Sequence, residues 1–326
     1  MSAFDDQLRA IVAAVELPSA DRARVRGVLG DTHEVSVAND RGPFLGLAEA
    51  LYAGHYSPMP GAFEASNLAP DAFLGQLYAA NPIPPRYEDG WTVARYDPNG
   101  FVLVRGMQQR VAALAEIMPL GGALAPGMPV RVPAQREALT APYGHYVITG
   151  RAIHDAKTGR QVRFYWNVGP GGAATFLREI GARLERRRIP FQAKVPAHPQ
   201  GYGRTDAGVL YLGDDDVQAA RDAIGATYQT LRSALRPQIP LFTREIAPGL
   251  AFGESPPTWD SFGMHRCDLI AEGLHRAFAS GASGDDARLA AVRDRLIAYG
   301  FDLDRFERNP TSQYPYPLEN LVADAA

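Results

Sequence analysis

The sequence predicts an α+β fold in which a mixed, largely antiparallel sheet is flanked by helices and preceded by an irregular, mainly helical N-terminal region. Three observations carry this prediction. Short runs of alternating polar and apolar residues recur between about 91 and 211, turn residues separate them, and segments with helical periodicity follow toward the C-terminus. With 326 residues, of which 46% are hydrophobic and 21% charged, the chain can bury a large core in one or two domains.

The first third of the chain predicts short helices joined by connectors rich in proline and glycine. Asn99-Gly100 separates two β-branched runs, and this dipeptide is typical of a hairpin turn. A soft domain boundary near residue 130 would divide an N-terminal region, 1–130, from a second domain, 131–326. The elements that we expect here are helices over 3–16, 44–55, 70–79 and 107–117, and strands over 91–96 and 101–105.

The remaining chain predicts the sheet and most of the helices. HYVITGRAIHD and GRQVRFYWNV have the pattern of a second hairpin or meander, IPFQAKV and AGVLYL that of two further strands, and FTREIAPGLAFG that of a short strand or loop. The tail rich in proline and tyrosine is expected to pack as a strap. Helices are expected over 172–187, 214–235, 263–279 and 285–299.

Charge and cysteine content exclude several classes of protein. A formal net charge of −3 provides no overall basic field for nucleic acid or an anionic membrane, so any anion site must be local. Cys267 is the only cysteine, which excludes an internal disulfide and fits a reducing compartment. The start, MSAFDDQLRA, is acidic where a signal peptide is basic, and no apolar run reaches the roughly 18 residues of a membrane helix. We therefore expect a cytoplasmic protein.

Cofactor and nucleophile motifs are weak or missing in the sequence. In NVGPGGAATF, Gly169, Gly171 and Ala174 match a loose dinucleotide fingerprint, but Pro170 interrupts it and no acid follows the next strand. The seven histidines lack a metal-ligand spacing such as HExxH, and no GxSxG nucleophile elbow occurs. We expect neither a metal nor an organic cofactor.

The strands carry a polar face instead. Alternation in RFYWNV sends Arg163, Tyr165 and Asn167 to one side and the apolar residues between them to the other. In IPFQAKV the same rule places Lys194 on a polar face between apolar neighbours. Lys194 and Lys157 are the only lysines of the chain.

Cationic and phenolic side chains follow on later segments. Convergent guanidinium groups bind phosphate in bidentate fashion, and positive charge together with burial favours a neutral lysine that can remove a proton. A single arginine is equally typical of a salt bridge, and a single tyrosine of a half-buried strand. The residues alone therefore indicate an anion site and no more. The members of this set are Arg204, Tyr211, Arg244, His265 and Arg266.

Five ordered blocks resemble the HopA-type effector family: RFYWNV, IPFQAKVP, YGRTDAGVLYL, FTREIAPGLAFGE and SFGMHRCDLIAEGL. The resemblance covers roughly residues 140–280, and relatives of this family include lyase components of thioamitide and class V lanthipeptide biosynthesis. It implies a phosphoserine/phosphothreonine lyase that β-eliminates phosphate from a kinase-phosphorylated precursor peptide to give dehydroalanine or dehydrobutyrine. It also implies a partner kinase, and we expect residues 1–130 to contact that kinase or the leader peptide.

The chain is also distantly similar to the phosphothreonine lyase effectors, which carry a base lysine on a strand and a phosphate-binding arginine and tyrosine downstream. Lys194, Arg204 and Tyr211 come in the matching order and at comparable spacing. The resemblance implies that Lys194 removes the Cα proton of the substrate and that Arg204 and Tyr211 hold its phosphate.

One departure concerns the general acid. Where the lyase effectors have Lys-x-His on a strand, this chain has Arg163-Phe164-Tyr165. Tyr165 or His265 would then donate the proton, or the phosphate would leave after neutralisation by arginines. The arginines expected to clamp the phosphate are Arg163, Arg204, Arg244 and Arg266.

Two alternatives stay open from the sequence. Some members of the HopA-type family are secreted proteins that act inside a host cell, so the chain could be a noncatalytic effector or binding module. A phosphatase acting through His265 would release phosphate and leave an alcohol in place of an alkene.

Overall fold

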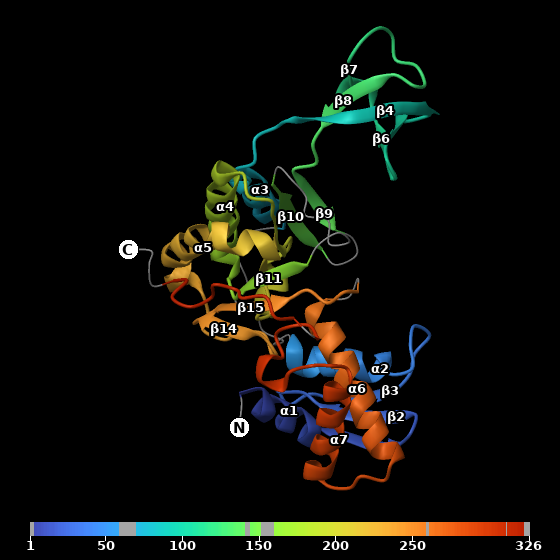
Figure 1. The fold of residues 1–326 in the computed structure, drawn as a ribbon, viewed down its shortest axis with the longest axis vertical. Coiled ribbons are helices and arrows are strands. Elements are labelled where there is room, and N and C mark those ends of the chain that lie inside the picture. The colour runs from blue at the N-terminus through green and yellow to red at the C-terminus, as the bar shows by residue number, and fades with distance from the viewer. Residues whose placement is uncertain are drawn as a thin grey trace.

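The structure is a computed structural model, and it describes residues 3–58, 70–140, 144–150, 160–258, 261–310 and 312–322. The predicted α+β class is confirmed. A central antiparallel sheet lies between helices, residues 3–58 and 262–306 form a mainly helical region on one side of it, and a small sheet projects on the other side (Figure 1). Within the described ranges, no helix has the length and apolar character needed to cross a membrane.

The central sheet has seven strands, and every neighbouring pair in it is antiparallel. Consecutive strands of the chain are often not neighbours in the sheet, because helices intervene between them. The order across the sheet is β14 (Arg244–Ala247), β15 (Leu250–Glu254), β11 (Gln161–Trp166), β13 (Gly208–Gly213), β12 (Gln192–Pro196), β10 (His145–Thr149) and β9 (Glu137–Thr140).

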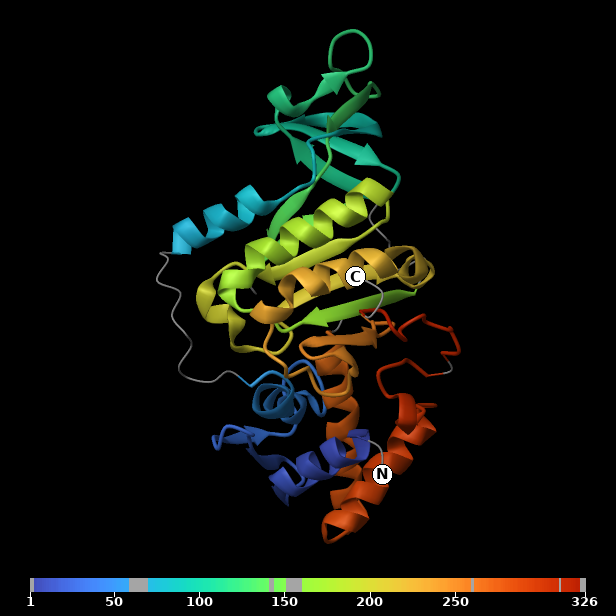
Figure 2. The ribbon, with the colours of Figure 1, turned by 90° about the vertical axis from the view of Figure 1, so that its left-hand side faces the viewer.

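One face of this sheet is covered by α3 (Pro70–Ala80), α4 (Pro170–Arg187) and α5 (Val217–Leu231) (Figure 2). Phe164 and Trp166 of β11 point into this layer and are fully buried. The apolar side of α4 meets them, because residues three and four apart share one helix face. This layer is the larger hydrophobic core. The polar side chains that alternate with Phe164 and Trp166 along β11 must therefore face the other way.

The opposite face meets a second core built from both ends of the chain. Here α1 (Ala3–Ala14), α2 (Leu45–Leu51) and the π-helical turn η1 (Tyr52–Tyr56) pack with α6 (Phe262–Ala279) and α7 (Asp285–Ala298). Ser261 caps α6 by accepting a hydrogen bond from the N–H of Met264 at 3.2 Å. Residues 3–58 therefore share a core with residues 262–306, on the far side of the boundary expected near residue 130.

A three-stranded sheet in the first 40 residues was not foreseen from the sequence. It comprises β1 (Val15–Ser19), β2 (Arg22–Arg26) and β3 (Thr32–Ser36). β2 reads RARVR, so only Ala23 and Val25 are buried and the charged residues between them dominate the local composition. Such a short, arginine-rich run gives almost no strand signal, since the preference for a strand comes from its packing partners.

The projecting sheet contains β4 (Tyr87–Asp97), β5 (Gly100–Arg105), β6 (Gln108–Ala112), β7 (Met118–Pro119) and β8 (Pro129–Pro133). The predicted hairpin at Asn99-Gly100 is present. The helix expected over 107–117 is wrong: β6 pairs with β5 from Phe101↔Ala112 to Arg105↔Gln108, and only 114–116 form a 3-10 turn, η2. A short apolar run has no periodicity that separates a helix from a strand, and the adjacent hairpin decides the outcome.

The other predicted elements are present with shifted ends. The helix expected over 214–235 is the 3-10 turn η4 (Asp214–Asp216), then α5, then the 3-10 turn η5 (Arg232–Ala234), and FTREIAPGLAFG forms the β14–β15 hairpin. Two further 3-10 turns are η3 (Pro199–Gly203) and η6 (Leu303–Arg305). The tail packs as expected, with Tyr316 and Leu318 buried in the larger core. The predicted strand end at 151–155, and Lys157, lie outside the described residues.

Candidate active site

The polar face of the central sheet is fixed by its register. Lys194 of β12 lies opposite Val147 of β10 on one side and Val209 of β13 on the other. Val209 in turn lies opposite Tyr165 of β11. Directly paired residues in adjacent strands point to the same face, so Lys194 and Tyr165 share the face that is turned away from α4 and α5.

Tyr211 lies between the two cations of this face. Its ring centroid is 5.4 Å from the Arg163 guanidinium carbon and 5.6 Å from the Lys194 amine. Burial by itself would raise the pKa of Tyr211, but the positive charges of Lys194 and Arg163 and a hydrogen bond with Lys194 outweigh it, and the pKa is lowered. Arg163, Tyr211 and Lys194 thus form a continuous cationic and phenolic strip across three strands.

His145 joins this strip, although no sequence motif distinguishes it from the other six histidines. It precedes Val147 by two residues on β10, so it shares the face of Lys194 and is its diagonal neighbour. Partial burial, followed by the charges of Lys194 and Arg204, lowers the pKa of His145 to about 4. Only the pairing of β10 with β12 brings His145 beside Lys194, and local sequence patterns do not reveal that pairing.

Arg204 enters the same region from the connection between η3 and β13. Its Nε donates to Oδ1 of Asp206 at 2.6 Å and its Nη2 to Oδ2 at 2.9 Å, and Nη2 also donates to the Tyr52 hydroxyl at 2.7 Å. Asp206 is partly buried, yet the Arg204 guanidinium and then the charge of Lys194 hold the pKa of its carboxyl below the usual value. Asp206 was also missed from the sequence, although it lies two residues from Arg204 in the block YGRTD.

Tyr165 lies beside this strip on the same face of the sheet and is 2% exposed. Its hydroxyl interacts with the Arg163 guanidinium and the Tyr56 hydroxyl, and burial raises its pKa. The ring of Tyr56 stacks on that of Tyr52 with centroids 5.1 Å apart. The turn η1 therefore closes the site from the helical side and links Tyr165 to the Arg204–Asp206 pair.

Several residues selected from the sequence lie apart from this cluster. Arg244 is on the edge strand β14, four strand positions from Lys194 on β12, which corresponds to roughly 19 Å at the usual interstrand spacing. Asn167 is buried, and its amide donates to the carbonyl oxygen of Gln238 at 2.9 Å. The expectation that Arg244 helps to clamp the same phosphate as Arg204 is therefore not supported by the strand order.

Arg266 is fully buried in the helical core. Its Nε donates to the carbonyl oxygen of Phe306 at 3.2 Å and its Nη2 to that of Arg308 at 2.8 Å. Burial lowers its pKa to about 9. His265 Nδ1 lies 2.8 Å from Arg266 Nη1. Both residues take part in the packing of α6 against the C-terminal segment, so we leave them out of the candidate site.

The cluster of His145, Arg163, Lys194, Arg204 and Tyr211 can bind an anion and move a proton. Guanidinium and ammonium groups attract a phosphate, whereas an imidazole with a low pKa and a lysine amine can exchange protons with a substrate held between them. Among the residues that the structure describes, no three histidine, cysteine or acidic side chains converge to hold a metal ion.

A protein-family model covers the part of the chain that contains this cluster. The model of the HopA1 effector protein family matches residues 137–308, which is more than half of the sequence and includes every strand of the central sheet. This chain belongs to the HopA1 effector protein family. No curated protein matches the chain.

Two solved structures are similar to this member of the HopA1 family. The structure of the effector protein from Pseudomonas syringae pv. tomato strain DC3000 has a TM-score of 0.55 and 18% identity, covering 94% of this chain and 96% of that one. The effector protein from Pseudomonas syringae pv. syringae strain 61 has a TM-score of 0.46 and 15% identity, covering 81% and 90%. At this identity the first likeness shows a shared fold.

Proposed function

We propose that this HopA1-family chain is a phosphoserine/phosphothreonine lyase that removes phosphate from a modified peptide or protein by β-elimination. The observation that supports it most is the placement of the Lys194 amine and the His145 imidazole as diagonal neighbours on one sheet face, beside Tyr211 and Arg163. A proton acceptor, a proton donor and anion-binding groups are the set that this reaction needs.

In the proposed step, the amine of Lys194, after it has given up its own proton, takes the Cα proton of the substrate. The electron pair of the broken Cα–H bond forms the Cα=Cβ bond, and the Cβ–O bond breaks with its electrons leaving on the phosphate. The products are an alkene, dehydroalanine or dehydrobutyrine, and inorganic phosphate. No redox change occurs, and Arg163 and Tyr211 stabilise the charge of the departing group.

His145 is the general acid in this proposal, in place of Tyr165 or His265. With a pKa of about 4, His145 is neutral in the free protein at neutral pH. A bound phosphate dianion favours the imidazolium form, which can then donate its proton to the leaving oxygen. Tyr165 is a weaker candidate because burial raises its pKa and the residue is only 2% exposed.

Arg204 has a positioning role in the proposal. Its bidentate contact with Asp206 and its hydrogen bond to Tyr52 fix the guanidinium, so that only part of its donor set is left for a phosphate. Arg163 is the proposed phosphate ligand, since its guanidinium carbon lies 5.4 Å from the ring centroid of Tyr211 on the face of Lys194 and its Nε donates to the Ser255 hydroxyl at 2.9 Å. The sequence interpretation instead had Arg204 clamp the phosphate together with Arg163, Arg244 and Arg266.

The resemblance described above extends the proposal to the substrate. A precursor peptide phosphorylated by a partner kinase, in lanthipeptide or thioamitide biosynthesis, is the proposed substrate. The alternative is a noncatalytic effector that binds a host protein, and it is favoured by the closed Arg204–Asp206–Tyr52 network, in which the cation already has its partners.

Mass spectrometry of phosphoserine and phosphothreonine peptides incubated with the protein separates these possibilities. We expect the wild type to yield a thiol-reactive alkene, and Lys194→Ala to lose at least a thousandfold in rate because no other group takes the Cα proton. His145→Gln should retain phosphopeptide binding and lose about a hundredfold. Arg186→Ala, an exposed site on α4 behind the sheet, is the matched control.

The contrary results are equally specific. An alcohol product would identify a phosphatase, and unchanged turnover in Lys194→Ala would remove that residue from its role as base. Tight phosphopeptide binding without any product, even with the cognate kinase present, would favour the noncatalytic effector.

A further inference from the structure

The Arg163 guanidinium is held from the side of β11 that lies away from Lys194. In the central sheet, β11 lies between β13, which carries Tyr211, and β15. Gly253 of β15 is the direct partner of Arg163, and Ser255 follows two residues later on the same face. The Arg163 Nε donates to the Ser255 hydroxyl at 2.9 Å. Ser255 therefore contacts the guanidinium from the β15 side, whereas Tyr211 lies on the β13 side.

Gln161 fixes the orientation of the Ser255 hydroxyl. The pairing of β11 with β15 continues to these two residues, because the Ser255 N–H donates to the Gln161 carbonyl oxygen at 2.8 Å. The Ser255 hydroxyl donates to Oε1 of Gln161 at 3.1 Å. Since a hydroxyl has one hydrogen, this bond turns a lone pair of the Ser255 oxygen toward the Arg163 Nε. The contact uses the Nε–H, so the guanidinium can meet a phosphate with its terminal nitrogens.

The segment after α7 holds Ser255 in turn. The Glu254 N–H donates to the Glu307 carbonyl oxygen at 2.9 Å, and the Asn309 N–H donates to Oε2 of Glu254 at 2.7 Å. The side-chain amide of Asn309 donates to the Ser255 carbonyl oxygen at 2.6 Å. Glu254 is 2% exposed and also accepts from the Tyr316 hydroxyl at 2.9 Å, as a buried carboxylate requires. Ser255 is thus attached both to β11 and to the C-terminal segment.

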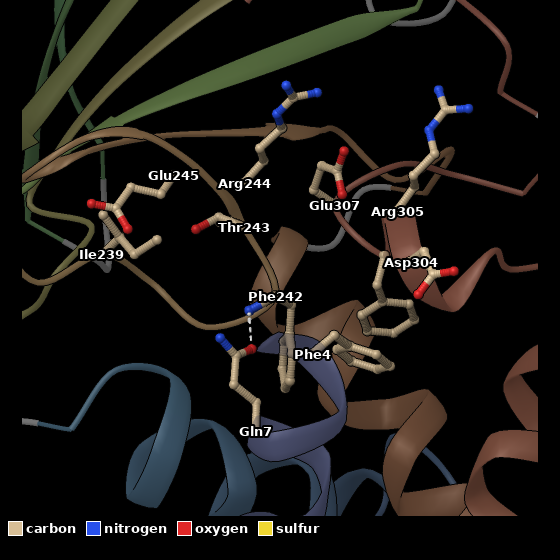
Figure 3. A pocket seen from close by; sticks show the side chains of 11 residues that line it. Phe4, Gln7, Ile239, Phe242, Thr243, Arg244, Glu245, Asp304, Arg305 and Glu307 are labelled. Carbon is tan, nitrogen blue, oxygen red and sulfur yellow. Dashed lines mark hydrogen bonds between the residues drawn. The ribbon is translucent and has the colours of Figure 1, made fainter. Parts of the chain in front are cut away.

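The same C-terminal segment lines a pocket of about 510 Å³, together with the start of α1 and the segment before β14 (Figure 3). The aromatic residues of this pocket are 2 to 7% exposed and belong to the helical core; they are Phe4, Phe242 and Phe306. Its charged residues are three acids and two arginines, so the pocket has no excess of positive charge for a phosphate. These charged residues are Arg244, Glu245, Asp304, Arg305 and Glu307. The C-terminal segment is therefore connected with phosphate binding through Ser255 and not through this pocket.

We propose that Ser255 is a positioning residue of the candidate active site, which holds the Arg163 guanidinium in the orientation that binds the phosphate of the substrate. The inference rests on the lyase proposed above for the identity of the ligand, but it concerns phosphate binding and is testable without turnover. A guanidinium that is already held by a second group loses less conformational freedom when the phosphate binds. Ser255 acts through Arg163 and does not itself touch the substrate.

A double-mutant cycle on the Kd of a fluorescein-labelled phosphothreonine peptide, measured by fluorescence polarisation, tests this role. We expect Ser255→Ala to raise Kd about tenfold, because a hydrogen bond to a charged group is lost. Ser255→Thr keeps the hydroxyl and should stay within about twofold of the wild type. In the Arg163→Ala background, Ser255→Ala should change Kd by less than about twofold, because the group that it positions is gone. Ser280→Ala is the matched control, since its hydroxyl donates to the Ala277 carbonyl oxygen at the end of α6, and its Kd should equal that of the wild type.

An unchanged Kd in Ser255→Ala, or an increase that is equally large in the Arg163→Ala background, would overturn the positioning role, since the effect would not pass through Arg163. Should Ser255→Ala not fold, Gln161→Leu tests the same link: it leaves the Ser255 hydroxyl without its acceptor, so Kd should rise, and the rise should vanish without Arg163. Absence of phosphopeptide binding by the wild type would also overturn the role. The lyase proposal fails separately, if the wild type binds the phosphopeptide and mass spectrometry detects no alkene.

Discussion

His145 and Lys194 illustrate how neighbouring charges control a single side chain. The pKa of His145 falls from its ordinary 6.5 to about 4 because burial and the nearby cations disfavour the imidazolium. Between these two values the unfolded chain binds a proton that the folded chain does not. Folding stability is therefore complete above about pH 6.5 and decreases as the pH falls toward 4.

His145→Gln should remove this part of the acid sensitivity. We expect the wild type to lose on the order of 2 to 3 kcal/mol between pH 7 and pH 4.5 from this group, and the variant to lose that much less. Urea unfolding at the two pH values measures the difference. His55, whose pKa burial also lowers, titrates in the same window, so the slope should shrink and not vanish. An unchanged slope would show that His145 is not held in its neutral form.

At the scale of elements, the contact between α6 and η1 positions the lower wall of the site. Gly263 in the first turn of α6 lies against the ring of Tyr56, and a Cβ there would come within 2.4 Å of three ring atoms. Tyr56 stacks on Tyr52, the partner of Arg204. The absence of a side chain at Gly263 thus permits the approach of η1 to the sheet.

Gly263→Ala should therefore displace Tyr56 or α6. We expect a loss of about 1 to 3 kcal/mol in the free energy of unfolding and weaker phosphopeptide binding. Gly75→Ala in α3 is the matched control, because nothing lies within 4 Å of its added Cβ. A helix-interior alanine there should stabilise by up to about 1 kcal/mol. Chemical denaturation of the two variants measures both effects, and equal stabilities would contradict the close packing at Gly263.

At the scale of the whole molecule, the projecting sheet of residues 87–133 has a separate core. Trp91, Val93, Leu103, Val130 and Val132 form a cluster of their own, distinct from the two cores that enclose the central sheet. Since stability follows the packing of each cooperative unit, this sheet can open while the central sheet stays folded.

Trp91→Ala tests that independence. The substitution should cost about 3 to 5 kcal/mol within the projecting sheet. Hydrogen exchange followed by mass spectrometry should show faster exchange over 87–133 and unchanged protection over 161–213. Elimination from short phosphopeptides should persist. Loss of protection in both regions would show that the two sheets unfold as one unit.

Local sequence determined which segments are helices or strands and which face of each strand is polar. Alternation placed Arg163 and Tyr165 on the face of the strand that is opposite to the face of Phe164. The apolar spacing of α4 predicted its buried side, and Asn99-Gly100 predicted a hairpin. These features depend on residues a few positions apart, so the sequence contains them. The family blocks lie on the same strands and helices.

Only the tertiary structure decided which of these segments meet. The order of strands brought His145 and Asp206 to Lys194, moved Arg244 to an edge strand, and buried Arg266 among backbone carbonyls of the C-terminal segment. The same long-range packing joined α1 and α2 to α6 and α7 and built the pocket around Phe242. The physical reason is that strand pairing and core packing depend on contacts between residues far apart in the chain, whereas periodicity reports on neighbours alone.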